Sequence, residues 1–255
     1  MLKLGFQDKI GDLFIPNGMP DEAQVRNFAA EISSVVKQGK EVVVVSSGAI
    51  AYGREALGWA DARSIAESQM LASVGQALLI ESHRRALAAH GLRIGQVLLT
   101  HRDISHRGSY LNASTTLRTL LSNQVVPVIN ENDAVSHEEI RFGDNDMLAA
   151  LVAVMVEADA LILLTQPDGL YDDDPANSPT AKRIQELSSE DGEGPEIKLE
   201  TKSSLGTGGM ASKLEAARGA GKGGVPVVIA SGRAESPIGR VLEGGNVGTL
   251  VTPAR

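Results

Sequence analysis

Apolar residues recur along this chain with two alternating periods. Within residues 21–38 the apolar side chains are spaced three and four positions apart, as on one buried face of a helix. Gly39 follows at the position of a helix C-cap. Residues 41–45 then form an apolar β-branched run, which is typical of a strand buried on both faces. The pattern predicts a helix followed by a strand.

The same alternation continues to the end of the chain. It predicts further helices over 68–89, 109–122, 146–157 and 211–220. It predicts further strands over 93–99, 125–129, 160–164 and 225–229. Alternating strands and helices indicate βαβ crossovers. We therefore expect an α/β fold with a mainly parallel central sheet and helices on both faces.

Residues 172–206 interrupt this pattern. They are polar and rich in turn-forming residues, with little periodicity. We expect loops and a short hairpin there, forming a lid or an irregular insert. The chain shows no internal repeat, and its 255 residues fit a single domain over 1–255.

Composition narrows the class of protein. Aromatic residues make up 3% of the chain, so the core should be aliphatic, and the absence of cysteine excludes disulfides and thiolate catalysis. A net charge of −8 argues against nucleic-acid binding. No run of about 20 apolar residues could span a membrane, and the N-terminus has no signal-peptide pattern. These features favour a cytoplasmic protein.

Ligands of open α/β sheets bind where strands end, so the residues after each strand are candidates. Ser46-Ser47-Gly48-Ala49 follows the strand at 41–45, and small residues there let backbone N–H groups approach an anion. The alternative is a tight strand-to-helix turn. Asn130-Glu131-Asn132-Asp133 follows the strand at 125–129 and places four hydrogen-bonding side chains in a row. The alternative there is an Asx turn or a helix cap.

Two further junctions carry charged residues. Gly143-Asp144-Asn145-Asp146 precedes an apolar helix, so its acids could cap that helix, bind a substrate ammonium, orient lysines or hold magnesium. The glycine-rich segment 205–213 leads into a helix with Lys213 near its start, which suits a polyphosphate. Lys213 could instead lie on the helix surface. Lys3 precedes Gly5 at the end of a possible strand and could also meet a phosphate or face solvent.

Several common sites are absent from the sequence. No Walker A loop or G-x-S-x-G elbow occurs, and the histidines lack the spacing of zinc ligands. We therefore assign no metal-ligating residue.

Taken in order, these segments resemble the amino-acid kinase family, and within it the branch that phosphorylates the side-chain carboxylate of glutamate. The resemblance covers nearly the whole chain, and its most specific parts are INENDAV and GDND. The motifs are KLG, VVSSGAIAYGREALG, GQVLLT, VVPVINENDAV, GDNDMLAAL, LILLT, GLYDDDP and GTGGMASKLEAA.

The resemblance implies ATP and Mg²⁺ as cofactors and L-glutamate as acceptor, in the first step of proline biosynthesis. It implies that the N-terminal part binds the acceptor and that the part from about residue 160 binds the nucleotide. It assigns catalytic roles to Lys3, Lys213 and Asp146, and acceptor binding to Ser47, Asp133 and Asn145. It assigns ATP binding to Lys3, Thr165, Gln166, Thr207, Gly208, Gly209, Met210, Ala211, Ser212 and Lys213.

The resemblance also bears on partners. It implies a homo-oligomer and feedback inhibition by proline. Many bacterial members continue into a small PUA domain where this chain ends in GTLVTPAR, and we expect no such domain here.

The chain departs from the family pattern near the expected nucleotide. Phe6 and Gln7 stand where the family has small hydroxyl residues, and Gln166 stands where it has an acid. Two alternatives therefore stay open beside a glutamate kinase. One is a kinase of another small carboxylate, and the other is a regulatory or binding homologue with weak catalysis.

Overall fold

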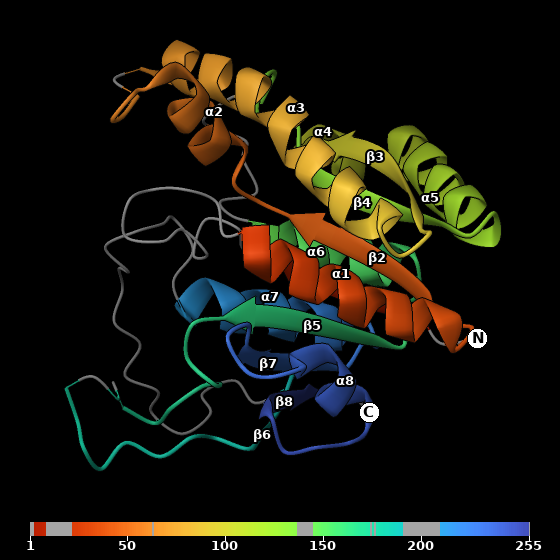
Figure 1. The fold of residues 1–255 in the computed structure, drawn as a ribbon. Coiled ribbons are helices and arrows are strands. Elements are labelled where there is room, and N and C mark those ends of the chain that lie inside the picture. Colours follow the sequence, from red (N-terminus) through yellow and green to blue (C-terminus); the bar gives the residue numbers. More distant parts are fainter. Residues whose placement is uncertain are drawn as a thin grey trace. The chain divides into compact units, whose positions relative to one another are not determined.

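Figure 1 shows the fold in a computed structural model of the chain. The structure describes residues 22–62, 64–136, 145–173, 175, 177–190 and 210–254, together with the backbone of 3–8. The chain divides into two compact units. Unit 1 comprises Met1–Asp8 and Gly143–Arg255, and unit 2 comprises Lys9–Phe142.

Unit 2 has a parallel sheet with the strand order β3-β4-β2. Its strands are β2 (Glu41–Ser46), β3 (Arg93–Leu99) and β4 (Val125–Glu131). Its helices are α1 (Glu22–Lys37), α2 (Ala49–Leu57), α3 (Ile65–Ala88), α4 (His101–Ser105) and α5 (Arg107–Ser122). Val45 of β2 pairs with Ile129 of β4, so the segments that follow these two strands leave the sheet at the same edge.

Unit 1 contains strands in the order β1-β5-β7-β8-β6. Its strands are β1 (Lys3–Asp8), β5 (Ala160–Thr165), β6 (Glu186–Ser188), β7 (Val227–Ser231) and β8 (Gly248–Thr252). Its helices are α6 (Asn145–Met155), α7 (Met210–Lys222) and α8 (Pro237–Leu242). The pairs β1–β5, β5–β7 and β6–β8 are parallel, and β7–β8 is antiparallel.

The predicted fold class is confirmed. Each predicted strand has a counterpart within about two residues at each end, and the cores are aliphatic. The four valines 42–45 of β2 are at most 2% exposed, and residues 161–163 of β5 are fully buried. The strand predicted over 225–229 begins at Val227, since Pro226 has no N–H for a sheet hydrogen bond.

Helix α2 is not among the predicted elements because a glycine interrupts its pattern. Gly53 lies inside this nine-residue helix, where a glycine normally indicates a break. A Cβ at Gly53 would lie 2.0 Å from the carbonyl oxygen of Leu71 in α3. The glycine is therefore required by close packing of α2 against α3.

The insert is only partly described. Arg183 of the insert forms an isolated antiparallel bridge with Tyr171, which precedes the insert, and β6 of the insert pairs in parallel with β8. The remainder, 191–206, lies outside the described residues.

Candidate active site

A buried ion pair joins the two helices that follow the polar segments of unit 1. The Lys213 ammonium donates to both carboxylate oxygens of Asp146, at 2.8 and 2.9 Å. Lys213 is 2% exposed and Asp146 is fully buried. The possibility that Lys213 is a helix-surface lysine is therefore wrong.

The pair follows from where α6 and α7 begin. Asp146 is the second residue of α6 and Lys213 the fourth of α7, and these two helices pack together. Removing two charges from water costs several kcal/mol per ion, and direct bonds between them offset that cost. The pair therefore fixes the lysine at the start of α7.

Three further residues predicted to bind phosphate lie at the start of α7. Met210, Ala211 and Ser212 form the first turn of α7, and the N-terminal end of a helix favours an anion. Asn145, which is predicted to bind the acceptor, begins α6 and is buried. The predicted residues Thr207, Gly208 and Gly209 lie outside the described residues, and Lys3 is described only by its backbone, at the start of β1.

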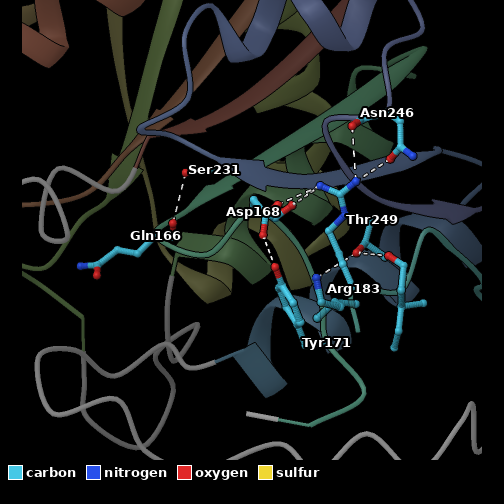
Figure 2. A network of polar contacts seen from close by, with 9 residues as sticks. Gln166, Asp168, Tyr171, Arg183, Ser231, Asn246 and Thr249 are labelled. Carbon is cyan, nitrogen blue, oxygen red and sulfur yellow. Dashed lines mark hydrogen bonds and ion pairs between the residues drawn. The ribbon is translucent and has the colours of Figure 1, made fainter. Parts of the chain in front are cut away.

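The carboxyl ends of β5 and β7 are tied together at the predicted nucleotide junction. Thr165 pairs with Ser231, and the Thr165 carbonyl accepts from the N–H of Gly232 at 2.8 Å. The Ser231 hydroxyl donates to the Gln166 carbonyl at 3.1 Å, as Figure 2 shows. The backbone on both sides of Gln166 is thus held, while the residue itself is exposed.

A polar network anchors the rest of this loop (Figure 2). Arg183 donates to a carboxylate oxygen of Asp168 at 2.9 Å and to the side-chain oxygen of Asn246 at 2.7 Å. The Tyr171 hydroxyl donates to the other Asp168 oxygen, and this bond raises the pKa of Tyr171. The Thr249 hydroxyl accepts from the Leu170 N–H at 2.8 Å. This network could not be identified from the sequence, because its members lie up to 81 positions apart and match no short motif.

In unit 2, the predicted acceptor residue Ser47 stands in the turn between β2 and α2. Ser46, before it, is fully buried, and its hydroxyl lies 2.8 Å from Nε2 of His83 in α3. Gly48, after it, has a φ of 108°, which glycine adopts without steric cost. The backbone here does form a tight strand-to-helix turn, and such a turn is compatible with a role of Ser47 in binding the acceptor.

The second predicted acceptor segment follows β4. The Asn130 side chain accepts from the Glu131 N–H at 2.8 Å, and the Glu131 carboxylate accepts from the Ser136 hydroxyl at 2.8 Å. The Asn132 carbonyl accepts from two backbone N–H groups further along the turn. Two of the four clustered side chains therefore shape the segment itself, and Asp133 is half-buried at its turn.

Burial of His83 predicts how stability depends on pH. Burial lowers the pKa of His83 from 6.5 to about 4, so the unfolded chain binds a proton in this range that the folded chain does not. The folded state should therefore lose about 3 kcal/mol of stability as pH falls from 6.5 to 4. His83→Gln should remove most of this dependence of the free energy of unfolding on pH, which urea unfolding at pH 6.5 and 4.5 measures.

Glu81→Gln is the matched control for the pH experiment. Hydrogen bonds from Arg84 and Arg85 lower the pKa of Glu81 from 4.5 to about 2, so its titration acts below pH 4.5. Between pH 6.5 and 4.5, the free energy of unfolding of this control should depend on pH as that of the wild type does. An unchanged dependence in His83→Gln would show that His83 does not cause it.

A sequence model of the amino acid kinase family matches residues 11–231 of this chain. The glutamate 5-kinase of Laribacter hongkongensis is 46% identical over 245 residues, which are 94% of this chain and 66% of that protein. The glutamate 5-kinase of Pseudomonas paraeruginosa is 51% identical over 218 residues, 85% of this chain and 59% of that protein. This chain thus spans about three-fifths to two-thirds of the length of these relatives.

Solved structures share the fold at low identity. A UMP kinase from Bacillus anthracis has a TM-score of 0.67 at 18% identity, covering 99% of this chain and 96% of its own. An isopentenyl phosphate kinase from T. acidophilum has a TM-score of 0.69 at 15% identity, covering 98% of this chain and all of its own. In the part of the chain that the structure describes, no helix combines the length and apolar character needed to cross a membrane.

Proposed function

This chain belongs to the amino acid kinase family, and we propose that it transfers the γ-phosphoryl group of ATP to the side-chain carboxylate of L-glutamate. The product is γ-glutamyl phosphate, in the first step of proline biosynthesis. The observation that carries the proposal is the buried Lys213–Asp146 pair, which fixes a cation at the start of α7. Relatives named glutamate 5-kinase, at 46–51% identity, support glutamate as the acceptor.

The reaction needs positioning and charge neutralisation more than it needs a base. A glutamate carboxylate is already ionised at pH 7. One of its oxygens attacks the γ-phosphorus and forms an O–P bond, while the bond from the γ-phosphorus to the β,γ-bridging oxygen breaks. The electron pair of that bond stays on ADP. Both reactants are anions, so the protein must hold them in line and offset their charge.

In unit 1 we assign the phosphates to Lys3, Lys213 and the first turn of α7. Lys213 places a fixed positive charge beside the phosphates, where it stabilises the charge that develops in transfer. Asp146 holds the Lys213 ammonium in place. Thr165 and Gln166 face the adenosine side, and the network of Arg183 and Asp168 holds their loop. Asn145 contributes to binding of the acceptor.

In unit 2 we assign the acceptor to Ser47 and Asp133. The Ser47 hydroxyl and the N–H groups of its turn bind a carboxylate of glutamate. The Asp133 carboxylate binds the α-ammonium, which distinguishes glutamate from N-acetylglutamate.

Mg²⁺ would enter this site bound to ATP. Among the described residues, no three His, Asp or Glu side chains gather to hold a metal ion. Protein sites bind Mg²⁺ through one or two carboxylates together with substrate phosphates. Both oxygens of the buried Asp146 bind Lys213, so the phosphates of ATP would hold the ion, which would neutralise their charge.

The family resemblance extends the proposal to partners. It supports a cytoplasmic homo-oligomer and proline as a feedback inhibitor. Dose-dependent loss of activity with proline would test the second point.

The direct test of the proposed activity is ADP release with each component omitted in turn. ADP should form only when ATP, Mg²⁺ and glutamate are all present. ADP formation with another carboxylate in place of glutamate would favour a different acceptor. Nucleotide binding without ADP formation would favour the weakly catalytic homologue suggested by Phe6, Gln7 and Gln166.

A further inference from the structure

Three polar side chains form a stripe along α3 in unit 2. Gln69, Gln76 and His83 are seven positions apart, which is close to two helical turns, so they lie along one side of the helix. We call them the α3 polar stripe. Each makes a hydrogen bond to a residue at or just beyond the end of β2 or β4.

Two members of the stripe hold the segment after β4. The side-chain amide of Gln69 donates to the carbonyl of Ser136 at 3.2 Å. The side-chain oxygen of Gln76 accepts from the amide of Asn130 at 2.8 Å. These bonds lie on both sides of Asp133, so α3 fixes the start and the end of the segment that carries it.

The third member holds the segment after β2. Nε2 of His83 lies 2.8 Å from the hydroxyl of Ser46, and both residues are buried. Beyond the turn, α3 meets α2 without intervening side chains, since a Cβ at Gly75 would lie 1.7 Å from the carbonyl oxygen of Ala49. Ser47 therefore lies between Ser46 and Ala49, both of which α3 contacts directly.

We infer that Gln69, Gln76 and His83 are positioning residues that hold Ser47 and Asp133 in register for the acceptor. This inference rests on the proposed function, because it concerns the segments assigned to glutamate. Replacing both members of a buried polar pair by apolar groups is often neutral for stability. The hydrogen bonds from α3 to both segments are therefore better explained by a need to position the segments than by a need for stability. Enzyme catalysis is sensitive to displacements of about 1 Å in the positioning of reacting groups.

The test compares variants that remove a hydrogen bond with variants that keep it. His83→Phe fills the site without a polar partner, whereas His83→Gln places an amide near Nε2. Gln76→Leu removes the acceptor oxygen, whereas Gln76→Glu keeps it. His83→Phe and Gln76→Leu should raise KM for glutamate by about 10- to 100-fold and leave KM for ATP within about twofold. The two conservative variants should recover most of the loss.

Leu87→Ala is the control for general destabilisation of α3. Leu87 is 1% exposed and lies one turn beyond His83 on the same helix. It should lower the melting temperature without a selective change in KM for glutamate. A rise in KM equal to that of His83→Phe would overturn the inference.

Backbone hydrogen exchange tests whether α3 holds the two segments, and it does so whether or not the wild type is active on glutamate. His83→Phe should speed exchange over 46–52, and Gln76→Leu over 130–136, each by about tenfold or more relative to Leu87→Ala. Unchanged exchange in both segments would overturn the inference. Faster exchange with an unchanged KM for glutamate in an active enzyme would also overturn it, since the segments would then be held without serving the acceptor. An inactive wild type would contradict the proposed function alone.

Discussion

Lys213→Ala should lower kcat for ADP formation by about 10²- to 10³-fold, the scale for losing one preorganised charge in the transition state. The ammonium is held by two bonds to Asp146 in a buried position, so it needs no reorganisation during transfer. KM for glutamate should change little, because Lys213 is assigned to the phosphates. Steady-state kinetics with ATP and glutamate varied in turn measure both effects.

The same variant should unfold more easily. Removing one partner of a buried ion pair leaves an uncompensated charge and costs about 3–5 kcal/mol. Lys213→Met with Asp146→Leu replaces both charges by apolar groups and should recover most of that stability. It should not recover kcat. A double variant that regains activity, or a single variant with near-normal kcat, would show that Lys213 has only a structural role.

Asp133→Ala should raise KM for glutamate by about 100-fold, while KM for ATP stays within about twofold. The estimate takes the lower end of the cost of an unpaired charge, about 3 kcal/mol, because Asp133 is half-buried. Glutarate and N-acetylglutamate both lack the free ammonium and should be poor acceptors of the wild type. Comparing kcat/KM for the three compounds measures this directly.

Asp61→Ala is the matched control for the loss of one carboxylate from unit 2. The Asp61 side chain is 73% exposed and pairs with Arg54 on the surface. It should leave both KM values near those of the wild type. If Asp133 only supports its turn, Asp133→Ala would lower the melting temperature without raising KM for glutamate.

The main elements of the fold could be predicted from local pattern. The four valines of β2 and the apolar run of β5 are buried on both faces, and such strands are recognisable without tertiary information. Helix α2 could not be predicted, because its Gly53 is explained only by contact with Leu71 of another helix.

The candidate site could be predicted only in part. Strand ends and a family pattern indicated Asp146 and Lys213, but their pairing joins residues 67 positions apart and depends on the packing of α6 against α7. The hydrogen bonds of Arg183 likewise join residues far apart in the sequence and could not be predicted from it. The α3 polar stripe did leave a signal, because Gln69, Gln76 and His83 recur every seven residues in a predicted helix. Such a polar repeat along one side of a helix can indicate hydrogen bonds to neighbouring strand ends.

Trapping with hydroxylamine shows whether this chain forms γ-glutamyl phosphate, because an acyl phosphate gives a hydroxamate whereas ADP release alone does not identify the acceptor. With ATP, Mg²⁺ and a panel of carboxylate amino acids, we expect γ-glutamyl hydroxamate from glutamate, and its formation should depend on both ATP and Mg²⁺. Aspartate and N-acetylglutamate should give far less. Formation of no hydroxamate from any member of the panel, at ATP concentrations that saturate binding, would contradict the proposed kinase activity.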